Sequence, residues 1–167
     1  MTMFARLPAH LRRLFDRIDA EAETPALRDA LSIWRHHRGS RLFPSLESLL
    51  AGELADIATD LFVFKAHRAD VDKWQLYRIG NHCTALLRPA HERSALDELG
   101  DRRLAVALQR LFEFMISLGE PVAATFSTGS GQDCAVYELL AAPLASDGKS
   151  IDSVLGGVSQ LSNRNDS

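Results

Sequence analysis

The sequence predicts an α+β fold: a five-stranded antiparallel sheet covered by helices, with a helical arm at its N-terminus. Two β-branched and aromatic runs, residues 61–67 and 73–79, flank a polar turn and are typical of a hairpin. Three further runs between residues 121 and 158 are separated by two glycine turns, which favours a three-stranded meander. Helical patterns precede the hairpin and fill the interval between the two groups of strands. Strands and helices therefore do not alternate, which is typical of an α+β domain.

Alternation and turn residues define the meander. Val122, Ala124 and Phe126 fall on one face of its first strand, so one side of the sheet is expected to be buried. The turns are residues 128–131, which contain two glycines, and Asp147-Gly148, a strong hairpin signal. We expect the glycine pair at positions 156 and 157 to end the last strand, and residues 159–167 to form a disordered tail.

Two helices are predicted before any strand. Residues 8–20 carry apolar side chains at helical spacing with arginines on the opposite side. A second helix is indicated by Thr24 as N-cap, Pro25 in its first turn and Gly39 as its stop. We expect residues 1–41 to form the helical arm, which either folds over the sheet or pairs with a second copy of the chain. The candidate dimer or partner contacts are Leu7, Leu11, Leu14, Phe15, Ile18 and Trp34.

The longest helix is predicted over residues 101–118, where apolar side chains recur at spacings of three and four. Gly119 and Pro121 end it. Residues 42–158 then make up the main domain, and Asn81 is expected to cap a short helix after the hairpin.

Composition indicates one globular domain. The chain has 167 residues, of which 46% are hydrophobic and 25% charged, and its net charge is −3. It has no apolar run of membrane-spanning length and no secretory signal pattern, so we expect a cytoplasmic protein. Cys83 and Cys134 lie outside any metal-ligating pattern, which predicts no zinc site and no disulfide framework.

The element order and several segments resemble those of PAS domains. Residues 143–158 resemble the terminal hairpin of the short, stand-alone PAS proteins of alphaproteobacteria. Residues 31–39 with 41–44 resemble the start of that family's domain, and residues 77–80 its second strand. The resemblance implies a sheet in which the first hairpin lies beside the last meander. It also implies a sensory or regulatory function in bacterial signal transduction, with a ligand cleft between sheet and helices.

The candidate ligand-binding residues are polar or apolar side chains expected near such a cleft. They are Tyr77, Arg78, His82, Ser127, Tyr137, Phe112 and Met115. A ligand pocket needs a few convergent polar groups among apolar walls, and the sequence does not show which of these side chains point inward. His82 could also ligate a haem, or be an imidazole hydrogen-bonded on a helix start. The sequence leaves the cofactor unknown.

Several function classes are not supported by the sequence. It contains no nucleophile elbow, zinc-protease pattern or phosphate-binding glycine loop, so we expect no enzyme activity and no catalytic residues or metal. The basic segment of residues 34–41 could touch phosphate, but residues 42–167 carry eleven basic side chains against seventeen acidic ones. We therefore expect neither nucleic acid nor a membrane as a partner.

Three hypotheses remain. The leading one is a stand-alone PAS-type sensory or regulatory protein that acts through a small-molecule ligand, a protein partner or a homodimer, by shifting a conformational population. The alternatives are a ligand-free interaction adaptor or dimerisation module, and a haem- or cofactor-binding sensor using His82. The fold alone does not distinguish them.

Overall fold

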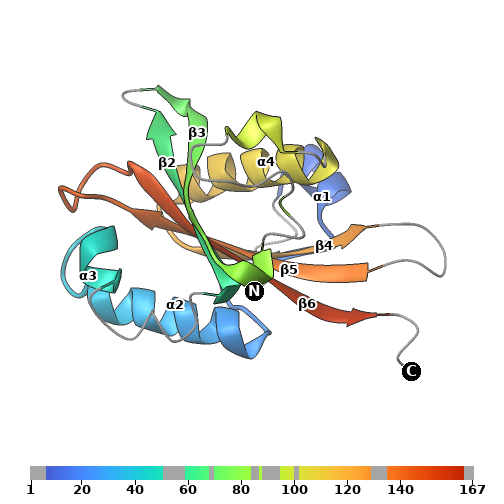
Figure 1. Ribbon diagram of the computed structural model, residues 1–167, viewed down its shortest axis with the longest axis horizontal. Coiled ribbons are helices and arrows are strands. Elements are labelled where there is room, and N and C mark those ends of the chain that lie inside the picture. The colour runs from blue at the N-terminus through green and yellow to red at the C-terminus, as the bar shows by residue number, and fades with distance from the viewer. Residues whose placement is uncertain are drawn as a thin grey trace.

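The chain folds around a six-stranded antiparallel sheet in which the strand order is β1-β4-β5-β6-β2-β3 (Figure 1). The computed structural model describes residues 7–50, 59–67, 70–83, 87, 95–99, 102–128 and 135–163. The strands are β1 (Arg17–Asp19), β2 (Leu61–His67), β3 (Asp70–Ile79), β4 (Val122–Thr128), β5 (Ala135–Leu144) and β6 (Ser153–Asn163). The α+β class is thus confirmed, with one more strand than the five predicted.

The first hairpin lies beside the last meander. Strand β2 pairs antiparallel with β6, with Leu61 opposite Gly157 and Lys65 opposite Ser153. Strand β5 then separates β6 from β4. This is the PAS-like arrangement that the resemblance implied, and it brings residues about ninety positions apart into one ladder.

The sixth strand was missed because its apolar spacing also fits a helix. The helix predicted over residues 8–20 ends early, as α1 (Ala9–Leu14), and the chain then becomes extended. Arg17 pairs with Thr125, and the amide of Asp16 donates to the carbonyl of Thr125 at 2.9 Å. Residues 16–19 gain hydrogen bonds to the backbone groups along the edge of β4, and this extended pairing is more favourable here than continuing the helix. Phe15 and Ile18 still reach the core, where a helix would also have placed them.

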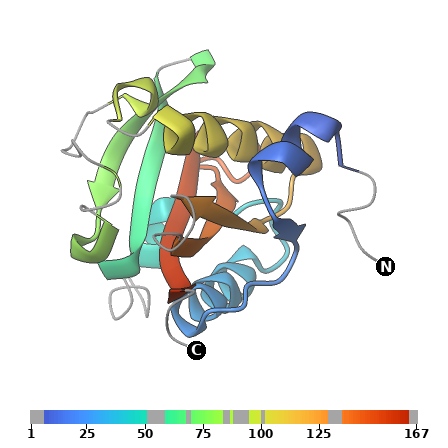
Figure 2. The same ribbon diagram turned by 90° about the vertical axis from the view of Figure 1, so that its right-hand side faces the viewer.

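Helices cover both faces of the sheet (Figures 1 and 2). On one side, α1 and α4 (Arg102–Leu118) share a core with Phe64 and Phe126. On the other side, α2 (Pro25–Arg38) and α3 (Leu46–Leu50) pack with Leu140 and Leu155. Residues 1–41 were expected to form one arm. Instead, within the described residues, α1 and α2 lie on opposite faces with β1 between them.

Helix α2 begins and ends where the sequence predicts. Pro25 occupies its first turn, and Gly39 follows it with a φ of 55°, a conformation that glycine adopts at little cost. Trp34 is fully buried, and its Nε1 donates to the carbonyl of Pro143 at 2.8 Å. This hydrogen bond ties the middle of the helix to strand β5.

A buried carboxylate holds the start of α2. Glu138 lies on β5 with 1% of its surface exposed. It accepts hydrogen bonds from the amides of Glu23 and Thr24 at 2.7 and 2.8 Å, and from the Thr24 hydroxyl at 2.7 Å. The Thr24 side chain therefore does not cap the helix as predicted, because its hydroxyl donates to Glu138 instead. The negative charge also lies at the helix end where the backbone dipole favours an anion.

Strand β6 is longer than predicted. Gly156 and Gly157 lie inside it, paired with Ala141 and Leu140, and residues 159–163 assigned to a tail continue the strand. The glycines were read as a strand end because glycine weakens strands. Here they allow close approach instead: a Cβ at Gly156 would lie 2.1 Å from Phe62, and one at Gly157 would lie 2.4 Å from Leu27.

The other predicted elements can be placed briefly. Helix α4 matches the predicted helix within a residue at its start, and the described start of the short helix after the hairpin is a 3₁₀ turn, Asn81–Cys83. The Asp147-Gly148 turn is present with Gly148 at a φ of 76°, whereas the turn at 129–131 and Cys134 lie outside the described residues. Within the described part of the chain, none of the helices is long and apolar enough to cross a membrane.

Candidate ligand site

An aromatic layer fills the space between the sheet and α4. Its members, here called the aromatic layer, are Phe62 and Phe64 of β2, Trp74 of β3 and Phe112 of α4. The Trp74 and Phe112 ring centroids lie 5.5 Å apart in an edge contact, and those of Phe64 and Phe112 lie 5.6 Å apart. Each ring is at most 2% exposed. The layer lies on the face where the PAS resemblance implies a ligand.

The indole N–H of Trp74 is buried and has no hydrogen-bond acceptor among the described residues. In the ranges that the structure describes, every other buried side-chain nitrogen or oxygen has a hydrogen-bond partner. An unpaired buried donor costs about 1–3 kcal/mol relative to a paired one, so most proteins avoid it. The other tryptophan, Trp34, has its acceptor in Pro143. The Trp74 N–H is therefore a specific polar group in an otherwise apolar layer, available to an acceptor atom.

The two tryptophans allow a matched measurement. Replacing Trp34 by phenylalanine leaves the Pro143 carbonyl without its donor, whereas Trp74→Phe removes a donor that has no partner. Both changes remove the same atoms from buried sites. We expect Trp34→Phe to lower the free energy of unfolding by about 1–3 kcal/mol more than Trp74→Phe, measured by urea denaturation. Equal losses would contradict the unpaired state of the Trp74 N–H.

Short 3₁₀ turns border the layer. Cys83, in the first of them, is fully buried, and its thiol lies 3.8 Å from the Leu61 carbonyl. Leu96 and Leu99, in and after the 3₁₀ turn Leu96–Glu98, are also buried in this core. A bridge between Gln75 and Ala95 fixes this turn beside β3. The two 3₁₀ turns therefore border the aromatic layer with leucine side chains and the Cys83 thiol.

Burial, and to a lesser extent the nearby Asp60 carboxylate, raises the pKa of the Cys83 thiol to about 12. A raised pKa disfavours the thiolate, so this thiol is a weak nucleophile at neutral pH. In a Cys134→Ser variant, we expect the remaining thiol to react with Ellman's reagent at pH 8 about a thousandfold more slowly in the folded than in the unfolded protein. Comparable rates with and without urea would contradict the burial of Cys83.

The same shift has a defined sign for stability. The folded-state pKa of Cys83 lies above its ordinary value. The contribution of the protonated Cys83 thiol to the free energy of unfolding is therefore complete below about pH 9 and is lost as the pH rises toward 12.

The structure describes the side chains of six of the seven predicted ligand-binding residues, and these six lie in different places. Phe112 and Met115 are fully buried on the core side of α4, and Phe112 contacts Trp74. Ser127 instead donates a hydrogen bond to the Asp16 carboxylate, and Tyr137 is half-buried at the border of the core. The backbone of His82 lies in the 3₁₀ turn Asn81–Cys83, and its side chain is outside the described residues.

Arg78 is exposed because the register shifts beside it, and Tyr77 is exposed next to it. Val63 pairs with Arg78 but Phe64 pairs with Leu76, so Tyr77 is an extra residue opposite the β2 ladder. The Tyr77 ring lies 3.7 Å from the Lys65 ammonium, on the surface rather than in the aromatic layer. Sequence alternation alone does not reveal this bulge.

The predicted partner contacts are buried within their own chain. Leu7, Leu11, Phe15 and Ile18 are at most 4% exposed and pack in the core shared with α4, and Leu14 is partly buried against it. Trp34 is buried on the opposite face, against β5. This is the packing onto the same domain that the sequence left open as the alternative.

Among the residues that the structure describes, histidine, cysteine, aspartate and glutamate side chains form no group that could hold a metal ion.

No family model matches the sequence, and no curated protein matches it. One similar solved structure is that of an RNA-binding light-oxygen-voltage receptor, which is 17% identical with a TM-score of 0.44 over 71% of this chain. The chain spans about a third of that receptor, 35% of its length.

One expectation is corrected by this comparison. Nucleic acid was excluded as a partner on the basis of charge, but a structurally similar chain is described as RNA-binding. The exclusion is therefore withdrawn. Acidic overall composition is a weak argument, because nucleic-acid binding depends on the local arrangement of basic side chains rather than on net charge.

Proposed function

We propose that this chain is a PAS-type sensory or regulatory domain that binds a small organic molecule in the aromatic layer, and that it is not an enzyme. The observation that carries the proposal is the buried N–H of Trp74, which has no acceptor in the part of the chain that the structure describes. The ligand has an apolar body and an acceptor atom, such as a carbonyl oxygen, because the surroundings of this N–H are aromatic and aliphatic. The chain belongs beside the short alphaproteobacterial PAS proteins. It works in the bacterial cytoplasm through a homodimer or another protein.

The signal would be a shift between two packings of the layer. Strand β3 is at the edge of the sheet and pairs mainly with β2, so its movement breaks fewer backbone hydrogen bonds than movement of a central strand. A ligand that accepts from Trp74 and displaces Phe112 favours one position of α4 over another. It shifts the equilibrium only by the difference in its affinity for the two packings.

The test is native mass spectrometry and absorption spectroscopy of the purified protein, combined with tryptophan fluorescence of a Trp34→Phe variant. In that variant all the tryptophan emission comes from Trp74. We expect a retained mass of a few hundred daltons, an emission change when that ligand is removed, and loss of retention in Trp74→Leu. Trp34→Leu is the matched control, which removes a buried tryptophan on the other face. Equal loss in both variants, or no retained molecule and no emission change with a library of small carbonyl compounds, would refute the proposal.

A second candidate is a ligand-free adaptor. It is favoured by the contacts among the rings of the aromatic layer. The ring centroids of Phe62 and Phe64, and those of Phe64 and Phe112, lie 5.6 Å apart, so the protein's own side chains fill this space. A colourless protein without retained ligand that forms a stable homodimer supports this function. A haem sensor using His82 predicts a Soret band in the same absorption spectrum.

A further inference from the structure

A surface groove lies outside the aromatic layer, between two surface connections. One wall is the connection between α2 and α3, with Ser40, Arg41 and Leu42, and the other is the turn between β5 and β6, residues 146–149. The groove has a volume of about 610 Å³. This falls within the range of small-molecule sites, about 300–1,000 Å³. The two walls are more than a hundred positions apart in the sequence, at the same end of the molecule (Figure 1).

The first wall is fixed to the fold. The left-handed conformation of Gly39 turns the chain out of α2, and the amide of Arg41 donates to the Arg38 carbonyl at 2.9 Å. Phe43 is buried under the connection, and the amide of Ala145 donates to the Pro44 carbonyl at 3.0 Å. Arg41 is therefore presented from an ordered turn.

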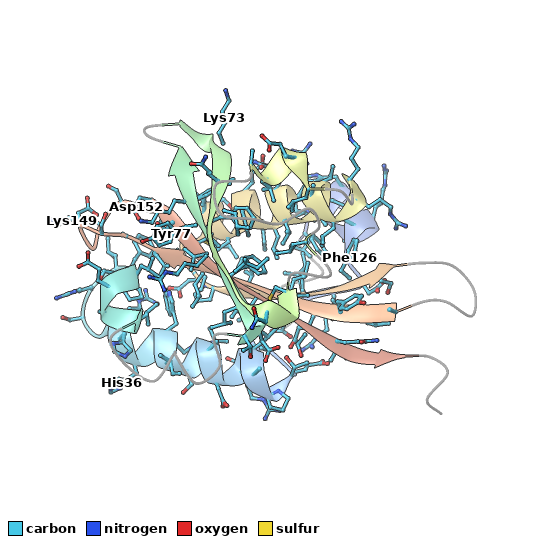
Figure 3. All side chains as sticks on the ribbon, viewed as in Figure 1. His36, Lys73, Tyr77, Phe126, Lys149 and Asp152 are labelled. Atoms are coloured by element: carbon cyan, nitrogen blue, oxygen red, sulfur yellow. The ribbon has the colours of Figure 1, made fainter. Side chains whose placement is uncertain are left out.

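The second wall is fixed by two aspartates. Asp147 Oδ1 accepts from the amides of Lys149 and Ser150, both at 2.8 Å. Asp152 Oδ2 accepts from the amide of Ser146 at 3.1 Å and from its hydroxyl. Gly148 has no side chain where the Arg41 stem passes, since a Cβ there would lie 3.8 Å from Arg41 Cδ. Lys149, labelled in Figure 3, thus lies in a turn held by side-chain hydrogen bonds.

The groove brings together two cations, Arg41 and Lys149, of which Lys149 is also attracted electrostatically to Asp147. No ion pair of Arg41 or Lys149 is found among the described residues, and both side chains are exposed. The one carboxylate in the lining is Asp147, whose Oδ1 is engaged by the two amides. Those hydrogen bonds, from Ser150 first, lower the pKa of Asp147, so it stays charged at neutral pH. The lining carries two positive charges and one negative charge.

We propose that this groove binds the phosphate monoester group of a small organic molecule. Arg41 and Lys149 would neutralise a group that carries up to two negative charges at neutral pH, and the planar guanidinium can donate two parallel hydrogen bonds to it. Ser40 supplies a further hydroxyl donor. Leu42, which is 57% exposed in the same lining, offers an apolar surface to the rest of the ligand. This site is independent of the aromatic layer.

The experiment is a titration of the full chain with phenyl phosphate, inorganic phosphate and benzoate, followed by amide chemical shifts. We expect phenyl phosphate to bind more tightly than inorganic phosphate or benzoate, with shifts at residues 40–42 and 146–149. The Arg41→Gln/Lys149→Gln variant should weaken binding about tenfold or more, as expected for losing two charge-assisted contacts. The matched control is Arg12→Gln/Arg103→Gln, which removes the same charge from exposed positions on α1 and α4 and should change affinity less than about twofold.

Three results would overturn the proposal. Equal weakening in the two double variants would show a non-specific effect of net charge. Benzoate binding as tightly as phenyl phosphate would show that the phosphate group is not recognised. A phosphoserine peptide binding more than about tenfold tighter than phenyl phosphate would assign the groove to a phosphorylated protein instead of a small molecule. None of these outcomes depends on whether Trp74 binds a ligand.

Discussion

The Glu138→Ala variant should lose about 3 kcal/mol of its free energy of unfolding, a large part of the 5–15 kcal/mol typical of a domain. Glu138 is 1% exposed and accepts three hydrogen bonds. Alanine removes the acceptor and leaves the two amides and the Thr24 hydroxyl without it. Because the amides precede the first turn of α2, the loss also removes a negative charge from the favourable end of the helix.

The measurement is urea denaturation followed by circular dichroism, with Glu113→Ala as control. Glu113 is exposed, and among the described residues it accepts hydrogen bonds from Arg110 and Gln109 of its own helix, so its loss should cost less than about 0.5 kcal/mol. Glu138→Gln keeps one side-chain oxygen and should lie between the other two variants. A loss below about 1 kcal/mol for Glu138→Ala would contradict the role of the carboxylate as an anchor for α2.

A second readout locates the effect. Hydrogen exchange of the α2 amides should accelerate in Glu138→Ala, whereas exchange in α4, on the opposite face, should follow only the global loss of stability. A uniform acceleration in both helices would show that Glu138 supports the sheet as a whole.

The role of Glu138 illustrates what the sequence could and could not predict. A single acid inside the apolar run of β5 is visible in the sequence as an anomaly. Its partners, Glu23 and Thr24, are more than a hundred positions away, and only the packing of α2 on β5 brings them together. Helices α2 and α4 were predicted well, because a long apolar stripe and its end signals are local properties.

Features that depend on a neighbouring strand were predicted less well. β1 was assigned to a helix, since only the free edge of β4 makes the extended conformation favourable. Arg78 would follow Trp74 and Leu76 on the core face by alternation, and a bulge where β3 pairs with β2 turns it to the other face. Trp74, in the same strand, was recognisable as an aromatic that could line a cavity, but its unpaired N–H depends on the three-dimensional arrangement of its neighbours.

The glycines of β6 give the last prediction. Gly156→Ala should lower the free energy of unfolding by about 2–3 kcal/mol, at the upper end of the usual cost of overpacking. The new Cβ would lie 2.1 Å from Phe62 Cε2, and the Phe62 ring is 1% exposed and in edge contact with Phe64. The ring therefore cannot move aside without disturbing the aromatic layer.

A double-mutant cycle with Phe62→Leu separates this overlap from a general effect of alanine in the strand. If the ring is the obstacle, Gly156→Ala should cost at least about 1 kcal/mol less in the Phe62→Leu background than in the natural sequence. Alanine has a better strand propensity than glycine, so any destabilisation beyond the cycle's error must come from packing. Additive costs would mean that Phe62 does not exclude a side chain at position 156. The glycine would then have to be explained by backbone conformation, and the close approach of β6 to the aromatic layer would lose its support.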